Sequence, residues 1–232
     1  KLFQGLSFET IPGYGSNGSI IHYRVTKKSN KVLKKNNLFL FDSGGQYLDG
    51  TTDITRTIAI GNPTDEQIFF FTKVLKGHIA LSKTIFKKKT KGKKLDKIAR
   101  RYLLEKKKDY PHGTGHGVGS FSSVHEGPQS ISKTSETLFE NGMIVSNEPG
   151  FYKHKKYGIR IENLLLIKEK KKKFSFEVLT LAPIDTKLII KEMLNIQEKK
   201  WLNSYHNDVF KKISKFLNTE ESLWLKNITK NI

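Results

Sequence analysis

Four acidic residues and one histidine lie within short, distinctive motifs spread over the middle of the chain. The motifs are FLFDSGG with Asp42, GTTDITRT with Asp53, HGTGHGVG with His116, SNEPG with Glu148 and GIRIEN with Glu162. Four carboxylates can share one site only if cations neutralise them, because like charges at close range raise each other's pKa. Carboxylates and imidazole suit divalent Mn, Co or Zn. The motifs therefore predict a fold that brings these segments together at a two-metal site.

Two of the acids lie on a predicted β-hairpin. The segments 38–42 and 51–60 are rich in β-branched and aromatic residues, and the region between them contains Gly44-Gly45 and Asp49-Gly50, which favour turns. Asp42 and Asp53 are about equally far from the hairpin tip, so we expect them to face each other across the strands and to reach one metal pair. Asp49 is interpreted as a turn residue, since Asp is common before Gly in turns.

Two further strands are predicted to carry the other acids. The segment 143–148 ends at Pro149-Gly150, which places Glu148 at a strand end. The segment 158–167 is predicted as one strand, on which Arg160 and Glu162 are two residues apart and share a face. We therefore expect Arg160 to orient the carboxylate of Glu162.

The HGTGHGVG motif is predicted to be extended rather than helical. His112 and His116 are four residues apart, but the interleaved glycines disfavour a helix by about 1 kcal/mol each relative to alanine. An extended loop or bulged strand would let metal and substrate approach the bare backbone. His125, in SVHEGP, follows within reach of the same pocket. Three other histidines are interpreted as packed or surface residues: His78, His154 and His206.

Apolar residues at helical spacing predict helices over 65–86, with Thr64 or Asp65 as N-cap, and over 95–106. These helices should cover one face of a curved antiparallel sheet, which makes the fold class α+β. A last strand is predicted over 174–181 and is ended by Pro183. A helical region is predicted to begin near Ile196, and a second short helix follows it.

The motifs resemble the catalytic domain of the metal-dependent Xaa-Pro aminopeptidases (aminopeptidase P), which share the pita-bread fold with prolidase and methionine aminopeptidase. The resemblance runs from about Leu6 to the C-terminus and is carried by IIHY, FDSGGQYLDGTTDITRT, HGTGHGVGSF, SVHEGP, ENGMIVSNEPGFY, YGIRIEN and WLNSYH. HGTGHGVGSF and WLNSYH resemble the eukaryotic cytosolic branch. The resemblance implies a pita-bread catalytic domain over 1–195 and a helical C-terminal extension over 196–232 packed on it. The family's helical stretch ahead of Leu6 is missing, so we expect a piece of a longer polypeptide.

The resemblance also implies the reaction, which is hydrolysis of the bond between an N-terminal residue and a following proline. A hydroxide held between two divalent ions would attack the peptide carbonyl. Mn is expected, with Zn or Co as alternatives. Asp53 and Glu162 would bridge both ions, Asp42 would complete one ion, and His116 with Glu148 would complete the other.

Further residues match the substrate side of the family's site. His22, His112 and His125 correspond to its three substrate-site histidines, and Arg160 is also placed among the substrate-binding residues. The resemblance implies that Glu148 shuttles the proton, that His125 donates to the developing oxyanion, and that His112 and His22 position the substrate.

Two alternative functions remain open. A prolidase would cleave only dipeptides and needs a site that clamps the substrate's free carboxylate. A catalytically silent pita-bread binding protein would be expected to lack metal ligands, and all five are present.

Composition limits the partners. The net charge of +20 could attract nucleic acid, but only five of the 42 basic residues are Arg and the lysines cluster in predicted loops, so no specific nucleic-acid partner is expected. The chain has no cysteine and no apolar run of about 20 residues, so we expect a cytoplasmic protein without membrane contact. The family's C-terminal extension implies a homodimer.

Overall fold

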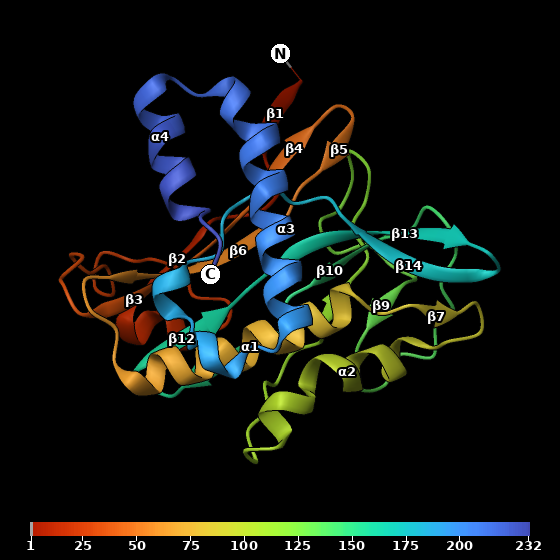
Figure 1. Cartoon of the computed structure of the whole chain (residues 1–232), viewed down its shortest axis with the longest axis horizontal. Coiled ribbons are helices and arrows are strands. Elements are labelled where there is room, and N and C mark those ends of the chain that lie inside the picture. Colours follow the sequence, from red (N-terminus) through yellow and green to blue (C-terminus); the bar gives the residue numbers. More distant parts are fainter. Residues whose placement is uncertain (1) are drawn as a thin grey trace.

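The structure is a computed structural model that describes residues 2–232, and it combines antiparallel strands with α-helices (Figure 1). The helices are α1 (Asp65–Ser82), α2 (Gly92–Leu104), α3 (Ile196–Ile213) and α4 (Thr219–Ile228). The strands are β1 (Phe3–Leu6), β2 (Ile11–Tyr14), β3 (Asn37–Ser43), β4 (Gly45–Tyr47), β5 (Gly50–Thr51), β6 (Ile54–Ile60), β7 (Phe86–Lys87), β8 (Gly115–His116), β9 (Ser130–Ile131), β10 (Ile144–Asn147), β11 (Gly150–Lys153), β12 (Tyr157–Arg160), β13 (Asn163–Lys170) and β14 (Lys173–Val178). Short 3-10 helices span Gly15–Ser19, Thr186–Leu188, Lys191–Met193 and Ser214–Phe216.

The strands pair antiparallel throughout the described residues. One sheet has the order β2-β3-β6 and another the order β10-β13-β14-β7. The pair β11-β12 lies between β10 and β13 in the sequence. Smaller groups are β1-β4-β5 and β8-β9. In Figure 1, α1 and α3 lie over the strands on one side of the molecule. The expected α+β arrangement, with helices covering strands, is confirmed.

Two apolar clusters hold the helices on the strands. The larger cluster joins α1 and α3 to β3, β11 and β12, and it includes the fully buried side chains of Leu75, Ile159 and Leu202. The smaller cluster joins α2 to β10, β13 and β14 around Leu95 and Val145. Burial of such side chains contributes about 1.5–3 kcal/mol each, so the helices keep the strands that carry the acids in a fixed arrangement.

Helix α1 begins where the sequence predicts and ends earlier. Thr64 is the N-cap, and its hydroxyl and the Gln67 side chain form a capping box. The helix ends at Ser82, so the predicted end at Phe86 was wrong. Phe86 instead lies on β7, where it pairs with Phe174 of β14 and packs into the smaller cluster. A buried sheet contact therefore overrides the helical spacing of Phe86.

The predicted hairpin over 38–60 contains an additional element. β4 and β5 form a tight turn of their own with Asp49 at its tip, as expected, and β4 pairs with β1, so these strands do not extend β3 and β6. Asp53 precedes β6, and the residue directly opposite Asp42 is Thr55. The prediction that Asp42 and Asp53 face each other directly was therefore wrong by two residues, although Asp53 keeps the same face as Thr55.

The predicted single strand over 158–167 is two strands. β12 pairs with β11, whereas β13 pairs with β10 and β14. The chain crosses from one sheet to the other at Ile161 and Glu162. Ile161 is buried in the larger core cluster. The apolar pattern therefore continues across the break between the two strands, and the sequence gives no sign of the break.

The C-terminal helices pack against the same core. α3 begins at Ile196, as predicted, and Asn195 with Glu198 forms its capping box. Tyr205 and Val209 of α3 and Leu225 of α4 belong to the larger cluster. A domain division at residue 195 stays a prediction. Within residues 2–232, the structure contains no helix that is both long and apolar enough to span a membrane.

Candidate metal centre

All nine residues singled out from the sequence line one cavity of about 530 Å³. They are His22, Asp42, Asp53, His112, His116, His125, Glu148, Arg160 and Glu162. Three overlapping groups within this set each have ligand atoms within 4.8 Å of one another. The groups are Asp42 with Asp53 and Glu162, His116 with Glu148 and Glu162, and Asp53 with His116 and His125.

Strand ends bring the ligands together. Asp42 lies near the end of β3, Glu148 directly follows β10, and Glu162 lies in the crossing between β12 and β13. His116 lies on β8, which was expected to be extended, and the backbone N–H of Glu148 donates to Thr114 just before that strand (2.8 Å). Gly115 allows this close approach, since a Cβ there would lie 1.9 Å from the Ser146 carbonyl oxygen.

Burial makes the acids costly to ionise without a cation. Burial raises the pKa of Asp53 to about 6, with Asp42 and Glu148 adding to the increase against the opposing effect of His116. The pKa of Glu162 is raised well above its ordinary value, first by burial and then by the charges of Asp53, Glu148 and Asp42. The pKa of Asp42 is also raised by burial, although Arg160 opposes the change. This electrostatic conflict is the one that the sequence predicted.

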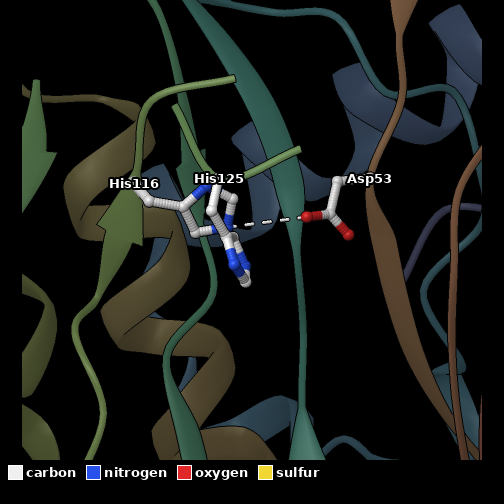
Figure 2. Close-up of side chains that lie close together, drawn as sticks. All are labelled: Asp53, His116 and His125. Atoms are coloured by element: carbon white, nitrogen blue, oxygen red, sulfur yellow. Dashed lines mark ion pairs between the residues drawn. The ribbon is translucent and has the colours of Figure 1, made fainter. Parts of the chain in front are cut away.

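His116 supplies part of the missing positive charge. Its Nε2 lies 3.5 Å from an Asp53 oxygen and 3.2 Å from a Glu148 oxygen, and Figure 2 shows the ring directed toward Asp53 with His125 beside it. Burial disfavours the charged ring, but the hydrogen bonds to Asp53 and Glu148 raise the pKa of His116 to about 11. Its Nδ1 donates to the Gly117 carbonyl (2.9 Å), so Nε2 is the nitrogen that faces the acids.

Glu148 is the acid that ionises most readily. Burial opposes ionisation, but the hydrogen bond from His116 and the charges of His112, His116 and Arg160 lower the pKa of Glu148 to about 2. The Ser146 hydroxyl donates to the same carboxylate (3.0 Å). Glu148 is therefore an anion in the metal-free arrangement.

Arg160 contacts Asp42 and not Glu162, which corrects the prediction. Its Nη2 lies 2.5 Å from Asp42 Oδ2 and its Nη1 donates to the Tyr152 hydroxyl (2.7 Å). The Tyr152 hydroxyl in turn lies 2.9 Å from His112 Nε2. Within residues 2–232, Arg160 and Glu162 are linked through Thr55, whose hydroxyl accepts from Arg160 and donates to Glu162. Glu162 lies in the sheet crossing, so the period-2 rule for one strand does not apply to this pair.

The remaining histidines lie around the acids. His112 is partly buried, and burial lowers its pKa despite the opposing charge of Glu148. His125 and His22 are exposed at the cavity, and the His125 ring centroid lies 4.2 Å from that of His116. His78 and His206 are fully buried and His154 is exposed, as expected for residues outside the site.

The sequence analysis missed three side chains that hold the ligands. They are Thr55, which donates to Glu162 (2.7 Å), Ser146, which donates to Glu148 (3.0 Å), and Tyr152, which joins Arg160 to His112. Thr55 lies two residues after Asp53 and Ser146 lies two residues before Glu148. The same-face rule for strands was therefore a signal that could have identified both.

The residues fit divalent metal ions. Asp42 Oδ1 and Glu162 Oε1 are buried and have no hydrogen-bond partner within residues 2–232. Buried carboxylate oxygens normally have a partner, and a cation would satisfy both atoms while relieving the repulsion among the acids. The donor set of four carboxylates and one imidazole suits Mn, Zn or Co.

Comparisons with known proteins agree with this geometry. The model of metallopeptidase family M24 matches residues 1–169, and the model of the C-terminal region of peptidase M24 matches residues 172–232. A probable Xaa-Pro aminopeptidase P of Laccaria bicolor is 47% identical over 97% of this chain and 37% of its own length. Aminopeptidase P2 of Arabidopsis thaliana is 48% identical over 96% of this chain and 33% of its own length. The chain thus spans well under half the length of the curated relatives it matches.

Solved structures share the fold. The X-prolyl aminopeptidase of Caenorhabditis elegans, described as a cytosolic enzyme with a di-nuclear active site, superposes with a TM-score of 0.96 at 39% identity, over 100% of this chain and 40% of its own. A prolidase of Pyrococcus furiosus gives a TM-score of 0.68 at 32% identity, over 76% of this chain and 50% of its own. The predicted pita-bread fold is confirmed, and the chain belongs to metallopeptidase family M24.

Proposed function

We propose that this chain carries the active site of a metal-dependent aminopeptidase that cleaves the bond between an N-terminal residue and a following proline. The observation that carries the proposal is the convergence of five ligands from distant segments, with Glu162 common to two of the ligand groups. The relatives and the C. elegans neighbour named above are Xaa-Pro aminopeptidases, which supports the reaction class.

The proposed ligand assignment follows from the groups. Glu162, Asp53 and His116 each belong to two of them. Each of the two carboxylates has two oxygens and can bridge two ions, whereas His116 presents one nitrogen to the acids. Asp42 would complete one ion, and His116 with Glu148 would complete the other. When bound, two divalent ions, with Mn expected ahead of Zn or Co, would supply hydroxide at neutral pH and polarise the peptide carbonyl.

The other residues would act on the substrate. Glu148 would accept the proton of the attacking water and pass it to the proline nitrogen as the peptide bond breaks. His125, exposed beside His116, would donate to the developing oxyanion. His112 and His22 would position the peptide, and Arg160, through Tyr152, would hold the His112 ring in place.

Two functional alternatives are less well supported. A prolidase is represented by the P. furiosus neighbour, which covers less of this chain and superposes less closely than the C. elegans enzyme. A silent binding protein would not need five converging ligands with unsatisfied buried oxygens.

The test uses metal-stripped protein with and without added Mn. The substrates are two peptides of four residues that differ only in having proline or alanine second, together with one Xaa-Pro dipeptide. We expect release of the first residue only from the proline peptide and only with Mn. Cleavage confined to Xaa-Pro dipeptides would indicate a prolidase, and absence of cleavage would contradict the proposal. Glu162→Ala should remove both turnover and paired metal binding, and retained two-metal occupancy would contradict the assignment of Glu162 as a bridging ligand.

The proposal extends to partners and location. Exposed apolar side chains on the C-terminal region, including Phe216, Leu223 and Trp224, support a homodimer through this region, which sedimentation would test. The description of the C. elegans neighbour as cytosolic supports a cytoplasmic location. No specific nucleic acid and no membrane is proposed as a partner.

A further inference from the structure

Arg56 joins three separate segments directly behind the metal centre. This partly buried side chain on β6 points its guanidinium at six oxygens, none of which belongs to a carboxylate. The acceptors are the backbone carbonyls of Thr55 (2.9 Å), Glu162 (2.5 Å), Ala182 (2.9 Å) and Pro183 (3.0 Å), the amide oxygen of Asn163 (2.7 Å) and the hydroxyl of Tyr205 (2.8 Å). The planar fork of arginine offers five N–H groups, so the six acceptors are served with one N–H of Nη2 shared between two of them.

Glu162 requires this support because it lies outside both neighbouring strand ladders. Its backbone N–H donates to the Thr55 carbonyl (3.1 Å), its carbonyl accepts from Arg56, and its carboxylate accepts from the Thr55 hydroxyl. Two consecutive residues of β6 thus fix both the backbone and the side chain of Glu162.

Arg56 is itself held by helix α3. Tyr205 of α3 is 6% exposed, its hydroxyl accepts from Arg56 and donates to the Ala182 carbonyl (2.8 Å), and its ring stacks on Trp201 with centroids 5.3 Å apart. The Asn163 amide that Arg56 contacts also lies 3.2 Å from His78 Nε2 on α1. Helix α3 therefore contacts the guanidinium directly, whereas α1 is linked to it through Asn163.

We propose that Arg56 is a positioning residue of the metal centre and that the Tyr205 hydroxyl keeps it in place. Helix α3 then influences the affinity for metal through Arg56 and Glu162, although none of its residues is a metal ligand. This inference rests on the proposed metal-dependent function and adds a residue pair to the same site. The Tyr205 hydroxyl lies behind the ligands, so its removal leaves every ligand and every substrate-facing residue intact.

The test measures Mn binding to metal-stripped protein by calorimetry. Tyr205→Phe removes one hydroxyl and keeps the ring stacked on Trp201. The matched control is Tyr14→Phe on β2, which removes a hydroxyl that is also hydrogen-bonded, to the backbone of Lys34, outside this network. We expect Tyr205→Phe to weaken Mn binding by roughly 5-fold, as for one lost hydrogen bond, and Arg56→Met to weaken it by about 10- to 100-fold. Arg56→Lys should lie between wild type and Arg56→Met. Tyr14→Phe should leave Mn affinity unchanged.

Thermal unfolding of the metal-free variants separates folding from positioning. Comparable melting temperatures for the two Tyr→Phe variants, with an Mn defect only in Tyr205→Phe, would support the inference, as would a lower kcat with unchanged KM. Wild-type Mn affinity in both Tyr205→Phe and Arg56→Lys would overturn it, even if Arg56→Met failed to fold. Mn binding to wild type without cleavage of Xaa-Pro peptides would refute the proposed reaction alone. A wild-type protein that bound no Mn would overturn both proposals.

Discussion

Removing one acid from the metal centre should stabilise the metal-free protein. Asp53 has a pKa of about 6 in the fold against an ordinary value of 3.8. Between these two pH values the folded protein holds a proton that the unfolded chain has released, so folding is most favourable below pH 4 and becomes less favourable as the pH rises through 6. Asp53→Asn keeps the shape of the side chain and removes this penalty.

The size of the effect follows from the shift. A change from 3.8 to about 6 is about 2 pKa units, which corresponds to about 3 kcal/mol at roughly 1.4 kcal/mol per unit. This free energy is an upper limit, because the substitution also weakens the hydrogen bond between residue 53 and the charged His116 ring. For a chain of this size, it raises the melting temperature by at most about 6–12 °C. With Mn present, Asp53→Asn should instead lower the melting temperature relative to wild type, because the asparagine side chain cannot supply the anionic oxygens that two ions would share.

The assay is calorimetric unfolding of metal-stripped wild type and Asp53→Asn between pH 4 and pH 8. Asp49→Asn is the matched control, since Asp49 is exposed in the β4–β5 turn. We expect wild type and Asp53→Asn to have the same melting temperature near pH 4, and the variant to have the higher melting temperature at pH 7.5. Asp49→Asn should show no such difference from wild type. A variant that is less stable than wild type throughout this pH range would refute the electrostatic reasoning.

Three further predictions concern other parts of the molecule. His125→Ala should leave the metal content unchanged, as measured by elemental mass spectrometry, and should lower kcat by about 100-fold, because one oxyanion donor contributes about 3 kcal/mol; an unchanged kcat would exclude His125 from the reaction. Leu202→Ala, at a fully buried position of α3, should reduce the free energy of unfolding by about 2–5 kcal/mol in denaturant titration, and a loss below about 1 kcal/mol would mean that α3 is not part of the core. Lys171 and Lys172 have positive φ angles of 48° and 63° in the β13–β14 turn, so replacing them with Asn and Gly should raise the melting temperature by relieving roughly 1 kcal/mol per residue. Lys171→Ala alone should change the stability by less than about 0.5 kcal/mol, and a lower melting temperature of the double variant would contradict the turn analysis.

The sequence was most informative where a local signal and a functional motif coincide. Thr64 and the predicted start near Ile196 agree with the structure because N-terminal capping is decided within a few residues. The extended conformation around His116 could likewise be predicted from the glycines beside it. The convergence of the ligands on one cavity was inferred from the motifs rather than from the geometry of the strands.

The failures all involve contacts between distant segments. The pairing of Phe86 with Phe174 and the switch of sheets at Ile161 depend on partners that no local pattern reveals. The contact of Arg160 with Asp42 is formed across 118 residues. Period-2 reasoning places residues on a face correctly, but it cannot identify the strand that will lie opposite.

The position of Glu162 in the crossing between two sheets also has a consequence for when the protein takes up metal. Thr55 holds its carboxylate, Arg56 holds its backbone carbonyl, and Tyr205 of α3 holds Arg56. The proposed ligands all come from residues 42–162, whereas Tyr205 is synthesised after them. We therefore expect the chain to reach its full affinity for metal only once α3 has docked, after every ligand has been made.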